Sequence, residues 1–469
     1  MFHEYPLEKI INQLEKDNLL PAILFRTSRR QCDVDLQSVV KKKYLEIHPQ
    51  HQQDIEIAVQ DVIKKYEYEP MIFKKHSQYE ALFKFGVGAH HAGQLLPWRL
   101  LLEEIMTKGL LKVLVATGTV AAGVDFPARS VVITAHSKRG NEGFKVLSPS
   151  EFQQMSGRAG RRGKDTVGFC FIAPNPYSDA RILVDVAKSP PEPLKSAYYA
   201  SPSTVLNLLK YRSLEELRFT VENSLAGFVD HKDSLVLVDE SKLVEQEIID
   251  STDLTNERKK LLEKKVKRIK RKSEELRLKQ ITQLEASIQA LTNMGYIDEK
   301  GSLTTKGKWA AELCTTYVLE FSEAINDFLF DDLSVEELIS LVASISGDSH
   351  RSYLTVKKSE VRQELFDAMK EKVLRVKENY KGSPYLSEVS VQPEAGVTVM
   401  EWVYAKNWLE YASLLKLCGV ADGDASRIIS QTADQLQQIG RLTESHPNLA
   451  RQALDARSLL MKPPISNEV

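Results

Sequence analysis

Cysteine and long apolar runs are both scarce in this chain of 469 residues. The four cysteines, Cys32, Cys170, Cys314 and Cys418, lack C-x-x-C spacing, so neither a disulfide framework nor a cysteine metal site is expected. No apolar run reaches the roughly 18 residues that a membrane-crossing helix requires. The first residues also lack the charged-then-apolar pattern of a signal peptide. These absences predict a cytoplasmic protein with no membrane contact and no metal.

Net charge is almost absent as well. The formal charge is −1 at pH 7, so the chain as a whole is not drawn to nucleic acid, and any such affinity must come from local groups of cations. Apolar residues make up 42% of the sequence, which is ample for packed cores. The length favours about three domains.

The densest group of phosphate-binding side chains lies between Gln154 and Gly163. Arg158, Arg161 and Arg162 occur there within five residues, and the small residues among them let the backbone turn tightly. A guanidinium presents a charged donor fork that fits phosphate oxygens. The stretch therefore predicts a polyphosphate contact. The alternative is a solvated basic loop in front of a strand at 167–172.

Short apolar runs alternate with loops and one amphipathic stretch through the first 190 residues. The runs cover 21–25, 112–116, 130–135 and 167–172, and such runs are typical of buried parallel strands. A loop at 86–93 and an amphipathic stretch at 100–108 lie between the first two runs. Residues 1–190 are therefore predicted to form one α/β domain with a mostly parallel sheet. In such sheets ligands bind at the carboxyl ends of the strands.

Four segments carry a resemblance to a known family. They are Phe25–Ser28, His90–Gly93, Ala116–Ala128 and Gln154–Gly163. In this order and spacing they resemble motifs IV, V and VI of the second RecA-like domain of superfamily 2 helicases. The nearest branch is the superkiller-type DExH RNA helicases, and the resemblance covers residues 15–175.

The resemblance implies an ATP site. Arg161 would be the arginine finger, Arg158 its companion, and Gln154 would face the same γ-phosphate. Phosphoryl transfer requires positive charge where negative charge develops. Gly123 and Asp125 would lie near the nucleotide, with Asp125 accepting hydrogen bonds from the ribose hydroxyls.

The resemblance also implies contacts with nucleic acid. Thr117 and Thr119 would bond its backbone, although Gly118 replaces the acidic residue that the family usually has between them. Adjacent histidines such as His90 and His91 do not face one metal ion as an i, i+4 pair would. We therefore expect a backbone or phosphate contact at His91 instead of a zinc site.

One half of the expected ATP site has no counterpart in the sequence. The resemblance calls for a first RecA-like domain with a G-x-x-x-x-G-K-[ST] phosphate loop and an acidic motif for magnesium. The loop pattern occurs nowhere, and Asp239–Lys242 is not a DExH box. We expect the C-terminal half of a helicase: a truncated product, a split gene product or a decayed paralogue. ATP and Mg²⁺ would be shared with a first RecA-like domain in a longer chain or a partner, and the chain alone would not hydrolyse ATP.

A polar Gly/Asn-rich stretch between the apolar arms 131–135 and 144–147 predicts a β-hairpin. It is either an ordinary exposed hairpin or, by the resemblance, a short form of the strand-splitting hairpin of superkiller-type helicases. The prolines at 189–193 then mark a domain boundary. Residues 191–235, with Ser203 as a helix cap, resemble the small winged-helix domain of this branch.

Residues 236–285 are predicted to form a charged helical linker, a reduced form of the arch that larger relatives insert here. Between Glu257 and Lys279 there are twelve Lys and Arg against four Glu, on a narrow apolar seam. Either the helix is solvated and packs on a neighbour, or its basic face follows phosphates.

The remaining residues, 286–469, are predicted to be helical and resemble the DSHCT domain of the same helicases. Ser334 and Glu337 form a capping-box pattern. The resemblance places a helix near Asp424 along an RNA channel, with Arg427 as an RNA contact. Trp402 and Trp408 would either stack on bases or lie in the core. This C-terminal part favours RNA over DNA as the polymer.

Two function classes remain open. The first is the motor half of an ATP-dependent RNA helicase that works with a first RecA-like domain. The second is a non-catalytic module that binds RNA or a helicase. The intact set of Gln154, Arg158, Arg161 and Asp125 favours the first.

Overall fold

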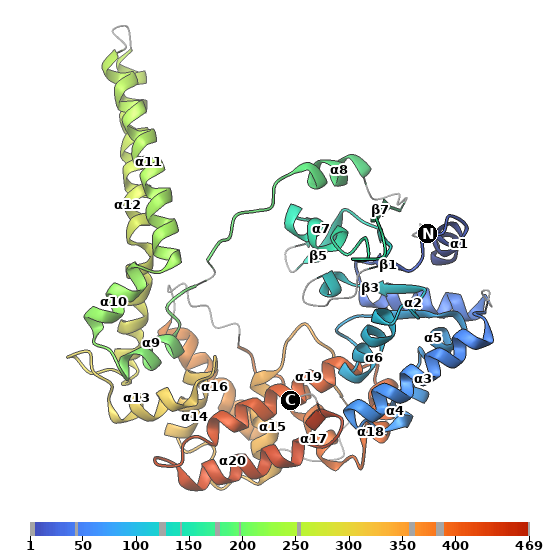
Figure 1. Ribbon diagram of the computed structural model, residues 1–469. Coiled ribbons are helices and arrows are strands. Elements are labelled where there is room, and N and C mark those ends of the chain that lie inside the picture. The colour runs from blue at the N-terminus through green and yellow to red at the C-terminus, as the bar shows by residue number, and fades with distance from the viewer. Residues whose placement is uncertain are drawn as a thin grey trace.

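The computed structural model describes residues 5–42, 46–121, 128–140, 143–173, 179–196, 198–250, 255–355, 362–380 and 389–467. An α/β domain forms the N-terminal part and a largely helical part follows it (Figure 1). Within the described ranges, no helix combines the length and the apolar character needed to cross a membrane.

The α/β domain is built on a parallel sheet, as the sequence predicted, and the sheet has five strands. Its strand order is β2-β3-β1-β4-β7, and Ile23 lies opposite Leu114 on one side and Val131 on the other. The strands are β1 (Ala22–Phe25), β2 (Val87–His90), β3 (Val113–Ala116), β4 (Ser130–Ile133) and β7 (Phe169–Ile172).

Strand β2 corrects one expectation, because residues 86–93 were predicted to be a loop. Gly88 and His90 interrupt the apolar pattern of this strand, and glycine is depleted in strands. The strand pairs with β3, and Gly88 lets α6 pack closely on it. A Cβ on Gly88 would lie 2.5 Å from Leu102 Cδ2.

Helices cover both faces of the sheet. Successive strand residues point to opposite faces of the sheet, so that Ile23 lies in one apolar cluster and Leu24 in another. One face packs on α1 (Leu7–Lys16), α2 (Arg29–Lys41) and α5 (Tyr79–Phe85). The other packs on α3 (Pro49–Tyr66), α6 (Leu96–Thr107), α7 (Pro149–Ser156) and α8 (Ala180–Lys188), with α4 (Pro70–Lys74) beside α3.

The predicted hairpin exists, but its first arm is different. Strands β5 (Ser137–Gly140) and β6 (Gly143–Val146) pair antiparallel, with Ser137 opposite Val146. The run 131–135 instead overlaps β4, because its apolar side chains are buried in the main sheet. Phe144 at the hairpin is 82% exposed.

Helices α9 (Pro202–Leu209) and α10 (Leu214–Glu222) follow an extended segment. Ser201, not Ser203, caps α9, because Pro202 occupies its first position. The next two helices, α11 (Leu225–Asp250) and α12 (Asn256–Asn293), pack together and project from the body (Figure 1). We call this pair the arm. The expected linker is thus two helices, and the boundaries expected at 235/236 and 285/286 fall inside α11 and α12.

The rest of the chain is helical, as predicted, and shares one core with α9, α10 and the end of α12. Its helices are α13 (Thr305–Ala310), α14 (Val318–Asn326), α15 (Val335–Ser346), α16 (Gln363–Asn379), α17 (Pro393–Tyr404), α18 (Trp408–Leu417), α19 (Asp422–Ile439) and α20 (Pro447–Leu460).

Two local expectations in this helical part have clear outcomes. The capping box of Ser334 and Glu337 is present at the start of α15. Trp402 and Trp408 are 0% and 2% exposed and pack on each other and on Tyr411. Base stacking by these tryptophans was therefore the wrong alternative, and they are core residues.

Candidate nucleotide and nucleic-acid sites

A cavity of about 380 Å³ opens at the carboxyl ends of β1, β3 and β4. Parallel strands expose their carboxyl ends at one edge of the sheet, so the loops that follow them meet there. The cavity brings together three predicted site residues from two distant segments: Thr117, Thr119 and Gln154. The other lining residues are Phe25, Arg26, Thr27, Gly118, Ala121, Ile133, Ala135, Lys138, Leu147, Glu151 and Met155.

The two threonines face each other after β3. Their Oγ1 atoms lie 3.0 Å apart, at the start of a short 3₁₀ turn, Gly118–Ala121. A Cβ on Gly118 would lie 3.1 Å from Met155 Cε. A larger side chain at this position would therefore require a small shift of the end of the Met155 side chain.

The arginine loop is tied to the segment that follows the threonines. Arg158 donates from Nε and Nη2 to the carbonyl oxygen of Ala121, at 3.1 and 2.7 Å. Backbone bonds link the same two segments: Ala128 N–H donates to Arg158 O at 2.9 Å, and Gly160 N–H donates to Ala128 O at 2.7 Å. These contacts place the threonine turn and the arginine loop on one surface.

Close backbone approach fixes the loop from its other side. A Cβ on Gly168 would lie 2.4 Å from both the carbonyl carbon and the oxygen of Ala159. Only glycine fits there without moving the backbone.

Arg161 is held by an acid that the sequence analysis did not single out. Its Nε and Nη2 donate to Asp165 Oδ2 and Oδ1 at 2.7 and 3.0 Å, and its backbone N–H donates to Oδ2 at 2.9 Å. The hydrogen bonds from Arg161 hold the pKa of Asp165 at about 2. The i, i+4 spacing of the two residues is the signal that could have identified the pair.

Gln154 lies on α7 and is exposed. Gly123 and Asp125 lie outside the described residues, so the predicted nucleotide contacts there stay predictions. The described part of the arginine loop supplies cations and donors, and these can bind and neutralise phosphate.

The two histidines point to different partners and are both buried. His90 Nε2 lies 2.7 Å from Glu103 and His91 Nε2 lies 3.1 Å from Asp33. The backbone N–H of Gly93 donates to His91 Nδ1 at 3.2 Å, so His91 Nε2 carries the proton and donates to Asp33. Both ring nitrogens of His91 are therefore used, and a phosphate contact from this loop would come from its backbone. Among the described residues no cluster of three or more potential metal ligands occurs.

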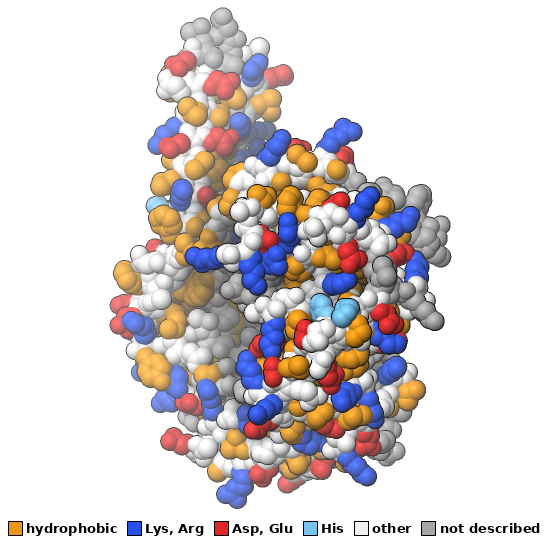
Figure 2. Space-filling model, turned by 45° about the vertical axis from the view of Figure 1, so that its right-hand side comes forward, with side chains coloured by type: hydrophobic (Ala, Val, Ile, Leu, Met, Phe, Trp, Pro, Cys, Tyr) orange, Lys and Arg blue, Asp and Glu red, His pale blue; other side chains and the backbone are white. Residues whose placement is uncertain are grey.

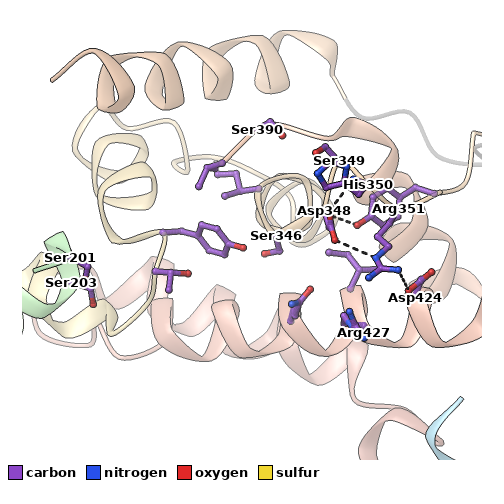
Figure 3. A pocket seen from close by; sticks show the side chains of 18 of the residues that line it. Ser201, Ser203, Ser346, Asp348, Ser349, His350, Arg351, Ser390, Asp424 and Arg427 are labelled. Carbon is purple, nitrogen blue, oxygen red and sulfur yellow. Dashed lines mark hydrogen bonds and ion pairs between the residues drawn. The ribbon is translucent and has the colours of Figure 1, made fainter. Parts of the chain in front are cut away.

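A second cavity, of about 870 Å³, lies between the start of α9, the segment after α15 and helix α19. Figure 3 shows Ser201 and Ser203 at one end, with Asp424 and Arg427 on α19 toward the other. Arg427 is exposed, and within the described residues no partner for its guanidinium is observed.

Asp424, one turn before Arg427, is already paired. Arg29 Nη1 donates to both of its carboxylate oxygens at 2.9 Å, and Arg351 Nη1 lies 3.6 Å away. Its negative charge is therefore compensated, and Arg427 keeps an uncompensated positive charge on the cavity wall.

Comparison with known proteins gives two family matches. The helicase conserved C-terminal domain matches residues 66–163, and the DSHCT (NUC185) domain matches residues 300–467. The first match contains both histidines and the arginine loop, and the second contains Arg427. The α/β domain is thus a RecA-like helicase domain.

Similar curated proteins are longer helicases. The chain is 34% identical over 291 residues to DExH-box ATP-dependent RNA helicase DExH15 chloroplastic of Arabidopsis thaliana, which covers 56% of this chain and 24% of that protein. It is 30% identical over 253 residues to ATP-dependent RNA helicase mtr4 of Schizosaccharomyces pombe, covering 50% and 22%. It is 32% identical over 213 residues to Antiviral helicase SKI2 of Saccharomyces cerevisiae, covering 44% and 16%.

The domain order and these relatives identify the class of protein. The chain corresponds to the C-terminal half of a superkiller-type superfamily 2 helicase. The matched part spans a quarter or less of the length of each of these three relatives.

Proposed function

We propose that this chain is the motor half of an ATP-dependent RNA helicase and supplies the arginine side of an ATP cleft. Gln154, Arg158 and Arg161 would face the γ-phosphate, with Gly123 and Asp125 near the rest of the nucleotide. A first RecA-like domain, in a longer chain or a partner, would hold the other side of ATP and its Mg²⁺.

One observation carries this proposal: the threonine turn and the arginine loop form one surface at the carboxyl edge of the sheet. Arg158 bonds Ala121 O, and the Ala128 and Gly160 backbone bonds lock the two segments together. Positive charge fixed in advance at the place where phosphate charge develops is the main contribution a protein makes to phosphoryl transfer.

The RNA path would run from the sheet domain to the second cavity. Thr117 and Thr119 would bond the RNA backbone next to the ATP cleft, and the loop of His91 would add backbone contacts. Arg427 would hold a phosphate in the cavity between α9 and α19. The exposed β5–β6 hairpin, with Phe144 at 82% exposure, would separate strands.

Residues 191–235 would contribute a winged-helix domain. Its first helices, α9 and α10, share the core of the C-terminal helices. This domain would buttress the cavity wall that carries Ser201 and Ser203.

The second candidate is a module that binds RNA or a helicase without turnover. The specific observation in its favour is the ion pair between Arg161 and Asp165, because a guanidinium engaged by two carboxylate oxygens must exchange that partner before it reaches a phosphate.

ATP hydrolysis separates the two candidates. The chain alone should show no RNA-stimulated hydrolysis, and addition of a first RecA-like domain from a close relative, joined in front of residue 1, should produce it. Hydrolysis by the chain alone that is lost in Arg161→Ala would contradict the need for a second domain. RNA binding without hydrolysis in either form would favour the binding module.

A further inference from the structure

The arm distributes its charge unevenly between its two helices. Helix α12 carries twelve Lys and Arg against five Glu, whereas α11 carries two Lys against seven Asp and Glu. Part of this contrast is local neutralisation across the contact between the helices. Acids of α11 pair with Lys265, Lys270 and Lys279 of α12 at 3.7, 2.6 and 3.2 Å.

Five other cations of α12 point away from α11. The side that packs on α11 includes the buried residues Val266, Ile269 and Ser273. At 100° per residue, the opposite side carries cations at positions i, i+4, i+7, i+8 and i+11, and all five are exposed. We call this stripe the basic face; it consists of Lys260, Lys264, Lys267, Arg268 and Arg271.

Few acidic side chains of the described residues pair with the cations of the basic face. In the described residues only Arg271 has an observed acidic partner, Glu275 at 3.3 Å, and both side chains are largely exposed. Between Arg258 and Ser273, Glu263 is the one acid on α12. At a rise of about 1.5 Å per residue the five cations extend over about 16 Å.

We propose that the basic face binds the phosphate backbone of duplex RNA beside the channel. This proposal rests on the proposed function for its choice of polymer. A straight helix with a cation on nearly every turn presents a rigid line of charge, which suits a rigid polyanion, and duplex RNA is bound mainly through phosphates and shape.

Single-stranded RNA fits this face poorly. Sites for single strands combine cations with aromatic side chains on which bases stack, and α12 contains no Phe, Tyr or Trp. Figure 2 shows cationic, acidic and hydrophobic side chains mixed over the visible surface. Because the net charge of the chain is −1, any attraction of RNA to the arm has to come from the basic face itself.

The test measures RNA affinity of the full chain by fluorescence anisotropy over a range of salt concentrations. The probes are a blunt RNA duplex and a single strand of the same length. The arm variant combines Lys260→Gln, Lys264→Gln and Lys267→Gln, since glutamine keeps the helix propensity of lysine. The control variant makes the same charge change at exposed lysines of the α/β domain and α18: Lys64→Gln, Lys74→Gln and Lys416→Gln.

We expect the arm variant to lose tenfold or more in duplex affinity and the control variant to lose little. Each lysine that contacts a phosphate adds about one unit to the slope of log affinity against log salt, so the arm variant should lose about three units. Polyglutamate of matched charge should not displace the duplex.

Equal duplex affinity and equal salt slope in the arm and control variants would overturn the proposal. Displacement of the duplex by polyglutamate would also overturn it and would indicate an acidic protein partner. Arg427→Gln separates the two proposals: it should weaken single-strand binding, which the arm variant should retain. If the wild-type chain binds neither RNA, the proposed function fails together with this one.

Discussion

At the scale of single residues, the arginine loop was identified from the sequence, whereas the contact between Arg161 and Asp165 was missed although its i, i+4 spacing was visible. The spacing of Arg158 and Arg161 among small residues is visible in the sequence. The role of Asp165 depends on a turn that returns the chain to Arg161, with oxygens 2.7 and 3.0 Å from the guanidinium. That turn follows from the left-handed Gly160 and Gly163.

His90 and His91 also show which properties of a residue the sequence reveals and which only the fold reveals. Their adjacency argued against a shared metal ion, but burial decided their roles. His91 uses both ring nitrogens to fix its own loop, so its contribution to any RNA contact is indirect. A sequence shows that a side chain can bind phosphate, and only the fold shows whether the side chain is available.

A third histidine gives a prediction about pH. His76 stacks on Trp98 with ring centroids 3.7 Å apart, and its Nδ1 accepts a hydrogen bond from the backbone N–H of Gln78 at 3.3 Å. Burial, with a smaller contribution from His91, lowers the pKa of His76 to about 3. The unfolded chain protonates near pH 6.5. The contribution of neutral His76 to the free energy of unfolding is therefore complete above pH 6.5 and is lost as the pH falls toward 3.

At pH 5 protonation of His76 in the unfolded chain should lower the free energy of unfolding of the α/β domain by about 2 kcal/mol relative to pH 7.5. His76→Asn, whose Oδ1 can accept the same bond, should remove that part of the pH dependence. Urea unfolding at both pH values, followed by hydrogen exchange of peptides from the sheet, measures it. His231→Asn, at an exposed position on α11, is the control. An unchanged pH dependence in His76→Asn would contradict the account.

At the scale of elements, strands and helices were predicted where the apolar pattern was strong. Four of the five sheet strands and the capped helix α15 follow the sequence closely. Strand β2 was missed because Gly88 and His90 interrupt its apolar pattern. Its burial comes from helices on both faces of the sheet: α2 and α5 on one face and α6 on the other. The tryptophans of α17 and α18 could not be placed from periodicity alone, since a buried and an exposed aromatic side chain give the same pattern.

The junction between α19 and the α/β domain was not predictable at all, since it joins residues 330 and 395 positions apart. Gly423 N–H donates to Gly93 O at 3.0 Å, and Asp424 pairs with Arg29. Both contacts lie where the helix that carries Arg427 begins. They connect the proposed RNA cavity to the loop of His91.

Gly423→Ala should open this junction. Its Cβ would lie 2.5 Å from the carbonyl oxygens of both Ala92 and Gln94, which are backbone atoms that cannot move separately. We expect faster hydrogen exchange at residues 90–95 and at the start of α19, with the sheet unchanged. Asp434→Ala, at an exposed position on the same helix, should leave exchange at the junction as in the wild type. Unaltered exchange in Gly423→Ala would show that the two parts do not depend on this contact.

At the scale of the whole molecule, the chain combines a RecA-like domain, a helical arm and a C-terminal helical domain that contacts the RecA-like domain directly. The order of these parts was predictable because each has its own sequence pattern. The form of the arm was not, since a charged segment without strong periodicity is compatible with one helix or two. We propose that each part contributes to one process: the sheet edge binds ATP, the cavity of Arg427 binds single-stranded RNA, and the arm binds duplex RNA.

We propose that the arginine loop completes an ATP site together with another domain. The most direct measurement is the rate of RNA-stimulated ATP hydrolysis by the chain joined to a first RecA-like domain, compared between Arg161→Ala and Arg162→Ala. Arg162 is the exposed neighbour in the same loop, so the pair controls for loss of charge. We expect kcat to fall about 10³-fold or more for Arg161→Ala and to change little for Arg162→Ala. Equal rates in the two variants would contradict the proposal.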